Sequence, residues 1–399
     1  MEGSYLSLGG NVTWRRLLLR VAVLCVALVL LDRAVAATLP AASVYLDSYR
    51  LPRLLPTSAI SDYALSIESA AAASRGKTTA VFLGASPTWG DAIRDRRHTV
   101  PYAFESAATS AGVPLQAFNL ASNGQFVGDQ YIIAKRLADD AGLVMVELTY
   151  HTFNPAARSG KVVRYAELPR LLGVGLSPRE RRLLGIESGE SAGASTVADR
   201  FLSANWLLWR QRDRLDRKLF GGKPRQALDD AVGKLLRRGR AAPDTLEDAD
   251  ETDGGESPDA GFTSFDALDP GKQMIVVARY SEDSAFEIDP ADAEVRVLSG
   301  LAGLLESRHK KAIFFMTPLN RDLVSEYELI DPKQYARNVS TIRRVVESKG
   351  YRLIDYNAGP AAVAADQFAD VSHTTDEGGQ AFGARLYRDT SAYLQAVTR

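Results

Sequence analysis

Cysteine and histidine are scarce in this chain. Its 399 residues include one cysteine, Cys25, and four histidines. A single cysteine excludes a disulfide within the chain and any metal site built from several thiolates. With only His98, His151, His309 and His373 available, few side chains can serve as a general base, and this shortage narrows the search for a catalytic site.

The chain also lacks an excess of either charge, since 48 Lys and Arg residues face 49 Asp and Glu residues. Balanced charge leaves no electrostatic footprint for nucleic acid, so we expect no nucleic-acid partner. No spacing of His, Cys and carboxylate residues suggests a metal site, and we expect neither a metal nor a cofactor. The length suffices for a large core, as one elaborated domain or two ordinary ones.

Long apolar runs are absent except near the N-terminus, where two arginines precede a stretch long enough to cross a membrane. The basic flank places residues 1–14 in the cytoplasm, residues 15–37 in the membrane as an anchor, and the rest outside. A cleavable signal peptide is the alternative, because residues 34–37 resemble a cleavage site. Asp32 and Arg33 crowd that site and favour the anchor. We therefore expect a single-pass protein of the cytoplasmic membrane with an extracytoplasmic domain, periplasmic or at the cell surface.

From Thr79 onward, strand-like apolar runs alternate with helical patterns. This alternation predicts an α/β fold of three αβα layers, flavodoxin-like, with a five-stranded parallel sheet covered by helices on both faces. The predicted strands are Thr79–Leu83, Leu115–Leu120, Leu143–Thr149, Lys311–Thr317 and Arg352–Tyr356. The predicted helices are Asp91–Ala111, Gly128–Asp140, Pro290–Ser307, Pro332–Ser348 and Glu377–Val397.

A large insertion interrupts this pattern between the third and fourth strands. It contains a basic amphipathic helix with Trp206 and Trp209, which is interpreted as a lid, a membrane-surface face or an ordinary packed helix. Residues 243–259 hold eight acidic residues and no basic one, a composition typical of disorder. The predicted division is a tail 1–14, an anchor 15–37, a tether 38–78, a first half-domain 79–158, an insertion 159–283 and a second half-domain 284–399.

Ser86 lies where the first predicted strand passes into a helix, within the sequence GASPTWG. A hydroxyl at that point is exposed at the carboxyl edge of a parallel sheet, which is the edge where such sheets bind ligands. The amides at the start of the helix can stabilise a negatively charged oxygen there. A serine that merely caps the helix is the alternative interpretation.

Asp370 and His373 lie three residues apart in the sequence DVSH, just before the last helix. This spacing in a turn brings a carboxylate to one nitrogen of the imidazole and fixes its tautomer. Both residues follow the last predicted strand, on the edge where Ser86 should project. The sequence therefore predicts that Ser86, His373 and Asp370 meet, although a helix-capping Asp370 and an exposed polar His373 would also fit an isolated pair of this kind.

Three blocks, GASPTWG, NLASNGQ and DVSH, together resemble the SGNH (GDSL-like) serine hydrolases over residues 79–154 and 286–399. With its N-terminal anchor, the chain is similar to bacterial proteins that O-acylate cell-envelope polymers. The resemblance implies that Ser86 is the nucleophile, His373 the general base and Asp370 the residue that orients it. It also implies that the N–H groups of Ser86 and Gly124 form the oxyanion hole.

The third block departs from the family, which usually has Gly-x-Asn-Asp after the third strand, whereas this chain has ELTYHTFN. Asn154 is displaced from the expected position, and Tyr150 or His151 lies nearer to it. Asn123, beside the glycine of the second block, is a further candidate donor. Asn320, in the turn after the fourth strand, is a candidate substrate contact, although a strand-ending turn is its alternative role.

The resemblance implies an anchored extracytoplasmic serine esterase or O-acyltransferase that forms an acyl-enzyme. Its substrates would be acyl esters, acetyl esters in particular, of a cell-envelope polysaccharide or glycolipid, and a multi-pass membrane acyltransferase is an implied partner. The alternative is a catalytically inactive SGNH-fold carbohydrate-binding or assembly module of an exopolysaccharide modification machinery. The unusual third block and the long insertion motivate this alternative.

Overall fold

The computed structural model describes residues 14–38, 77–137, 139–156, 158–166, 168–186, 263–281 and 286–398. Contacts divide the chain into two units, which are described separately: one contains residues 14–38, and the other contains the described residues from 77 onward. The described residues leave out four predicted features: the tail before Trp14, most of the tether, the helix with Trp206 and Trp209, and the acidic segment 243–259.

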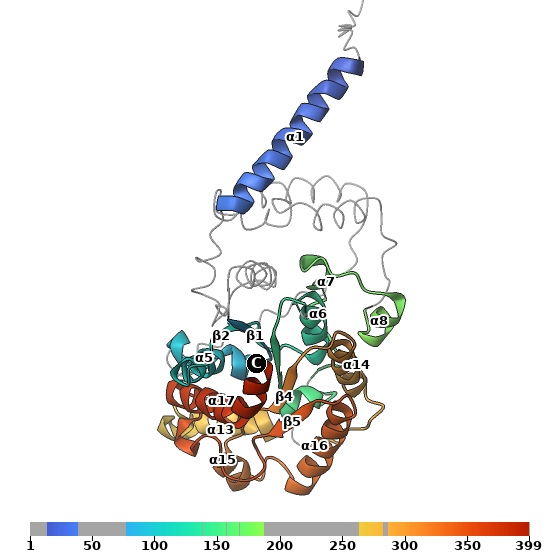
Figure 1. Ribbon diagram of the computed structural model, residues 1–399. Coiled ribbons are helices and arrows are strands. Elements are labelled where there is room, and N and C mark those ends of the chain that lie inside the picture. Colours follow the sequence, from blue (N-terminus) through green and yellow to red (C-terminus); the bar gives the residue numbers. More distant parts are fainter. Residues whose placement is uncertain are drawn as a thin grey trace, which may run out of the picture. The chain divides into compact units, whose positions relative to one another are not determined.

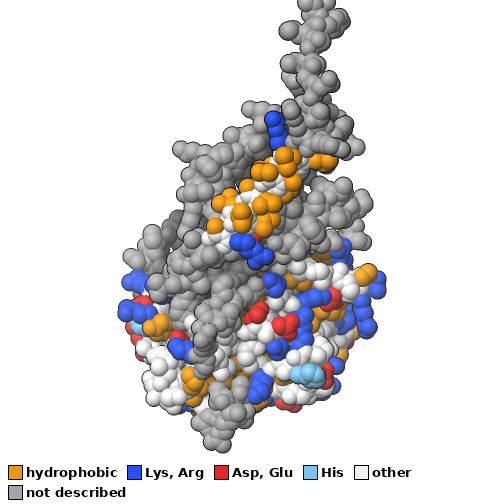
Figure 2. All heavy atoms as spheres, turned by 45° about the horizontal axis from the view of Figure 1, so that its top comes forward, with side chains coloured by type: hydrophobic (Ala, Val, Ile, Leu, Met, Phe, Trp, Pro, Cys, Tyr) orange, Lys and Arg blue, Asp and Glu red, His pale blue; other side chains and the backbone are white. Residues whose placement is uncertain are grey.

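Helix α1 (Trp14–Thr38) covers the predicted anchor as one continuous helix. Its exposed side chains include large aliphatic ones (Figure 2), among them Leu19 at 66% exposed and Leu30 at 65%. Counting only the residues that the structure describes, no helix is long and apolar enough to cross a membrane. Membrane anchoring by residues 15–37 therefore stays a prediction.

The second unit is built on one five-stranded sheet in which every strand pairing is parallel, as the sequence predicts (Figure 1). The strand order is β2-β1-β3-β4-β5, so the chain winds outward in both directions from β1 and β3. Ligands of such doubly wound sheets bind at this switch point, beyond the carboxyl ends of the strands. The strands are β1 (Thr78–Leu83), β2 (Leu115–Asn119), β3 (Leu143–Leu148), β4 (Ala312–Met316) and β5 (Arg352–Asp355).

Helices cover both faces of the sheet because the inner strands are apolar on both sides. Within β1, Ala80 and Phe82 pack into the core beneath α5 and α17, whereas Val81 and Leu83 pack into the core beneath α6, α14 and α16. In Figure 1 these two helix groups lie on opposite sides of the strands. The helices are α5 (Val100–Ser110), α6 (Val127–Leu137), α14 (Ala293–Ser307), α16 (Pro332–Glu347) and α17 (Asp376–Thr398).

The predicted helix Asp91–Ala111 is wrong over its first nine residues. A short helix, α4 (Ser86–Trp89), directly follows β1 and ends at Gly90, whose φ of 89° is left-handed. The chain then turns, and α5 begins only at Val100, followed by Pro101, which suits the first turn of a helix. Apolar residues before Val100, such as Ala92 and Ile93, are buried although they do not lie in a helix. Their spacing in the sequence therefore suggests a helix that does not form.

Four further α-helices lie in the described part of the second unit. Helices α7 (Leu168–Leu171) and α8 (Pro178–Leu183) follow β3, and α13 (Pro270–Ser281) precedes α14. Helix α15 (Arg321–Glu326) follows β4 and is capped by the Asn320 side chain, which accepts a hydrogen bond from the Leu323 N–H. Helices α7, α8 and α13 fall inside the predicted insertion and pack on the same core as α6 and α14.

Candidate active site

Ser86 is the first residue of α4, at the carboxyl end of β1 and therefore beside the switch point of the sheet. Its side chain is partly exposed, while Ala85 before it and Pro87 after it are buried. The turn has no side-chain cap of its own, since Ala85 carries no acceptor. The serine hydroxyl is thus held at the sheet edge by a short, buried strand-to-helix connection.

Ser86, His373 and Asp370 form a continuous hydrogen-bonded relay. The Ser86 Oγ lies 2.7 Å from Nε2 of His373, and the Nδ1 of His373 lies 2.6 Å from Oδ2 of Asp370. Residues nearly three hundred positions apart in the chain therefore meet as the sequence predicts. The His373 and Asp370 side chains are 17% and 22% exposed, so the relay is screened from solvent but reachable.

The loop before α17 holds Asp370 in one orientation. Its Oδ1 accepts the N–H groups of Ser372 and His373 at 2.8 and 2.7 Å, so only Oδ2 faces the imidazole. An antiparallel bridge joins Phe368 to Thr374 across the loop, and the Ala369 N–H donates to the His373 carbonyl at 2.8 Å. The carboxylate and the imidazole are therefore fixed relative to each other by main-chain contacts.

The electrostatics of the relay assign the proton positions. Burial alone would raise the pKa of Asp370, but the His373 imidazole and the amide donors lower it to about 2. An ionised carboxylate only accepts, so Nδ1 of His373 carries the proton and the neutral imidazole accepts from Ser86 through Nε2. Burial lowers the pKa of His373, but Asp370, with Asp91 and Glu147 nearby, raises it to about 8.

Tyr280, from α13, is a fourth member of this cluster. Its hydroxyl donates to Oδ2 of Asp370 at 3.2 Å and lies 3.1 Å from Oγ of Ser372. The ring of Tyr280 also packs against the ring of His151, with centroids 5.1 Å apart. A residue of the predicted insertion thus contacts the carboxylate that orients His373.

Glu147, near the end of β3, is a fully buried carboxyl that supports the Ser86 turn. Its Oε2 accepts the Thr88 N–H at 3.1 Å, and its Oε1 accepts the Thr149 hydroxyl at 2.6 Å. It therefore supplies to α4 the acceptor that Ala85 lacks. The side chain passes so close to Gly84 that a Cβ there would lie 2.2 Å from Oε2. Burial raises the pKa of Glu147 above its usual range.

The loop after β2 lies against the same turn. The Gly84 N–H donates to Oε1 of Gln125 at 3.0 Å, and the Ser122 N–H donates to the Gly84 carbonyl at 3.1 Å. Gly124, in this loop, has a φ of 63°, which favours glycine. The Arg164 guanidinium packs against Gly124, so a side chain there would also collide with it.

The remaining predicted site residues are placed as follows. Tyr150 is 1% exposed, and its hydroxyl accepts from the Asn338 side chain at 2.8 Å. Asn154 is buried and accepts the Ala156 N–H at 2.9 Å, while Asn320 is 2% exposed and caps α15. Burial leaves these three side chains little surface to offer a substrate.

His151 and Asn123 are partly exposed. Asn123 lies in the loop against Gly84 and uses its carbonyl to accept the Tyr165 hydroxyl at 2.5 Å. His151 lies in a 3₁₀ turn directly after β3, with its ring against Tyr280. Both ring nitrogens of His151 are buried, so among the proposed third donors Asn123 is the accessible one.

Sequence reasoning missed Tyr280, Glu147 and Gln125. Glu147 carried a signal, because a carboxylate in the middle of the apolar run LVMVEL needs a buried partner. Gln125 lies inside the second block, directly after Gly124. Tyr280 had no local signal, since it lies in the insertion and reaches Asp370 only through the tertiary fold.

Neither a protein-family model nor a curated protein matches this chain.

Proposed function

We propose that this protein is a serine esterase or O-acyltransferase of the SGNH type, anchored in the cytoplasmic membrane through residues 15–37 with its α/β domain outside. The observation that carries the proposal is the relay from Ser86 through His373 to Asp370, with separations of 2.7 and 2.6 Å. Its position at the switch point of the parallel sheet, and the resemblance of the three blocks to that family, support the same conclusion.

In the proposed reaction, the Ser86 oxygen attacks the carbonyl carbon of an acyl ester while Nε2 of His373 takes the hydroxyl proton. Asp370 stabilises the imidazolium that forms. The N–H groups of Ser86 and Gly124 are the proposed donors to the tetrahedral oxyanion. Collapse expels the sugar alkoxide, which receives the proton from His373, and leaves the acyl group on Ser86.

A second nucleophile then resolves the acyl-enzyme. It gives its proton to His373 as it attacks the acyl carbon, and His373 returns that proton to the Ser86 oxygen as the serine leaves. Water as the nucleophile makes the protein an esterase, and a sugar hydroxyl makes it an O-acyltransferase. The proposed substrates are acetyl esters of a cell-envelope polysaccharide or glycolipid, with a multi-pass membrane acyltransferase as partner.

The third oxyanion donor bears on the rate. Loss of one such donor typically costs on the order of 10²–10³ in rate. Because the Tyr150 and Asn154 side chains and both ring nitrogens of His151 are buried, the partly exposed Asn123 is the proposed replacement. A weak oxyanion hole suits a slow or partner-dependent transferase better than a fast hydrolase.

A fluorophosphonate probe tests the mechanism. It should label the full-length protein at Ser86, identified by peptide mass spectrometry, and should fail to label Ser86→Ala and His373→Ala. Ser307→Ala is the matched control, because Ser307 is an exposed serine at the end of α14, outside the relay, whose hydroxyl donates to the Leu304 carbonyl. An absence of labelling in the wild type, with circular dichroism showing a folded protein, would refute the enzyme and favour the inactive carbohydrate-binding module.

A further inference from the structure

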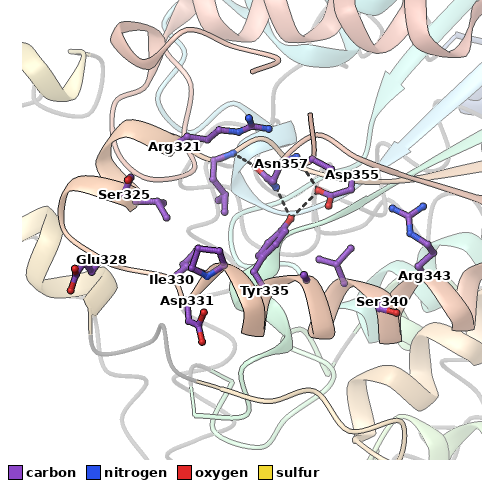
Figure 3. Close-up of a pocket in the computed structure, with 16 residues that line it drawn as sticks. Arg321, Ser325, Glu328, Ile330, Asp331, Tyr335, Ser340, Arg343, Asp355 and Asn357 are labelled. Atoms are coloured by element: carbon purple, nitrogen blue, oxygen red, sulfur yellow. Dashed lines mark hydrogen bonds between the residues drawn. The ribbon is translucent and has the colours of Figure 1, made fainter. Parts of the chain in front are cut away.

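A groove of about 980 Å³ lies between α16, α15 and the loops that follow β4 and β5 (Figure 3). Its volume is within the range of about 300–1,000 Å³ that ligand sites occupy. None of Ser86, His373 and Asp370 lines it. The groove is therefore a concave site that is separate from the relay.

The groove lies on the same edge of the sheet as Ser86. Asp355 ends β5, and Asn357 follows two residues later, so both lie at the carboxyl ends of the strands. In the order β1-β3-β4-β5, the end of β5 is three strands from the end of β1, a separation of roughly 14 Å at the usual strand spacing. A substrate much longer than one sugar unit can therefore reach both sites.

The main chain ties the groove to the relay loop. Leu319 lines the groove, and the next residue, Asn320, donates its N–H to the Val371 carbonyl at 2.8 Å. Val371 follows Asp370 directly. This hydrogen bond fixes the wall of the groove relative to the loop that orients His373.

The floor of the groove carries a fixed polar network, drawn in Figure 3. The Tyr335 hydroxyl donates to Oδ1 of Asp355 at 2.9 Å and accepts from Nδ2 of Asn357 at 2.8 Å. The Asn357 N–H also donates to Oδ1 of Asp355. Because these bonds orient the side chains before any ligand arrives, Oδ2 of Asp355 is presented as an acceptor at little entropic cost.

Apolar side chains separate the polar groups. Leu319, Val324, Ile330 and Val339 contribute the apolar part of the lining. Sugar rings combine apolar C–H faces with a rim of hydroxyl groups that both donate and accept hydrogen bonds. A groove that mixes aliphatic surface with oriented hydroxyl, amide and carboxylate groups matches that chemistry.

The charges of the groove disfavour an anionic ligand. Its two arginines are already engaged with main-chain carbonyls: Arg321 donates to Gly359 and Arg343 to Leu353. Three carboxylates, those of Glu328, Asp331 and Asp355, also line it. Because the carboxylates outnumber the arginines and both arginines already donate to main-chain carbonyls, an uncharged polyhydroxylated ligand fits better than a phosphate or uronate.

We propose that this groove binds an uncharged oligosaccharide segment. Taken with the proposed function, on which this step rests, the segment is the non-reacting part of the polymer whose ester Ser86 attacks. Such remote binding positions the reacting group and contributes to the rate without touching it.

Isothermal titration of the full-length chain tests the groove with four defined probes. These are the neutral tetrasaccharides of maltose, cellulose and N-acetylchitin type, and tetragalacturonate as the anionic comparison. Ser325→Trp and Ser340→Trp each place a bulky ring in the groove from an exposed position. Ser348→Trp is the matched control, because it is exposed at the far end of α16 and does not line the groove.

We expect at least one neutral tetrasaccharide to bind, with affinity reduced tenfold or more in Ser325→Trp and Ser340→Trp and changed less than twofold in Ser348→Trp. Ser86→Ala should bind as the wild type does. The inference is overturned if no neutral tetrasaccharide binds, if tetragalacturonate binds more tightly, or if binding survives both tryptophans. Phosphonate labelling of the tryptophan variants should persist, which shows that they fold.

The two proposals fail separately in this design. If the probe never labels Ser86 but the tryptophans abolish glycan binding, the enzyme proposal fails and the groove stands as a glycan site. If labelling is normal and no glycan binds, the groove proposal fails and the relay stands.

Discussion

The Tyr280 hydroxyl donates a hydrogen bond to Oδ2 of Asp370, the same oxygen that accepts Nδ1 of His373. Tyr280 lies on α13, which comes between β3 and β4 in the sequence. Asp370 lies in the loop before α17. The insertion therefore contributes directly to the relay. Because a donor withdraws charge from the carboxylate, Tyr280 weakens the pull of Asp370 on the imidazole proton.

Tyr280→Phe removes that donor and nothing else from the ring. We expect the pKa of His373 to rise by a few tenths of a unit, because Asp370 then stabilises the imidazolium more strongly. The rate of Ser86 labelling should fall by a few-fold, since the carboxylate also loses one of the bonds that orient it. The labelling rate measured from pH 5 to pH 10 gives both quantities.

Tyr351→Phe is the matched control for this substitution. It also removes one buried hydroxyl, which donates to the Lys310 carbonyl at 3.0 Å, before the amino end of β4. Its pH profile should coincide with that of the wild type. A Tyr280→Phe profile that shifts to lower pH would contradict the role assigned to the hydroxyl.

The pH dependence of the wild type follows from the His373 imidazole, whose pKa is raised to about 8. Only the neutral imidazole can take the Ser86 proton, and its fraction increases as pH rises through that value. We expect labelling of Ser86 to be half-maximal near pH 8 and to fall about tenfold for each unit below it. A half-maximum near 6.5, the ordinary value of histidine, would show that Asp370 does not act on His373 in solution.

Asp370→Asn removes the charge that raises the pKa of His373. Burial, which lowers the pKa of the imidazole, is then opposed only by the smaller effects of Asp91 and Glu147, so the half-maximum should move below that of the wild type. If the proposed triad operates, the maximal rate should fall on the order of 10⁴-fold, as is typical when a Ser-His-Asp triad loses its carboxylate. Asp366→Asn, an exposed change in the same loop, should alter neither value.

The sheet was predictable because its strands are short apolar runs in an alternating βα pattern. The predicted strands Thr79–Leu83 and Leu143–Thr149 each differ from the observed strands by one residue at one end. The meeting of Ser86 with His373 was predictable for the same reason, since parallel strands bring all their carboxyl ends to one edge. The spacing of apolar residues could not predict where α5 begins. That start depends on Gly90, which ends α4, and on Pro101, which lies in the first turn of α5.

The support of the site was not predictable from local pattern. Tyr280 and Asp370 are 90 positions apart, and Thr88 and Glu147 are 59 apart, so only the folded chain brings each pair together. The groove beside α16 likewise requires the tertiary arrangement of Tyr335, which bonds to a residue at the end of β5. The sequence pointed to Ser86, His373 and Asp370, whereas Tyr280 and Glu147, which support them, came from the structure.

Glu147 should position the Ser86 turn through its acceptor rather than its charge. Glu147→Gln keeps an oxygen for the Thr88 N–H and should retain most of the labelling rate. Glu147→Ala leaves that buried amide without an acceptor, which costs about 1–3 kcal/mol of unfolding free energy before any cavity is counted. Urea denaturation and Ser86 labelling of the two variants measure these effects, and equal losses in both would contradict the assigned role.

Gly84 should tolerate no side chain while Glu147 is present. The closest atom to an added Cβ is Oε2 of Glu147, at 2.2 Å, so Gly84→Ala must displace the carboxyl from Thr88. Overpacking of this kind costs about 1–3 kcal/mol. Gly175→Ala is the control, because a Cβ there meets nothing within 4 Å and the residue has no left-handed backbone.

A double-mutant cycle separates this collision from a general effect of the methyl group. In a Glu147→Ala background the Oε2 and Cδ atoms that crowd the added Cβ are gone and only the residue-147 Cβ, at 2.7 Å, stays, so Gly84→Ala should cost less than it does in the wild type. Contacting residues commonly show such non-additivity, of about 0.5–3 kcal/mol. Additive costs in urea denaturation would mean that the two side chains do not compete for the same space, and the close packing beneath the Ser86 turn would then need another explanation.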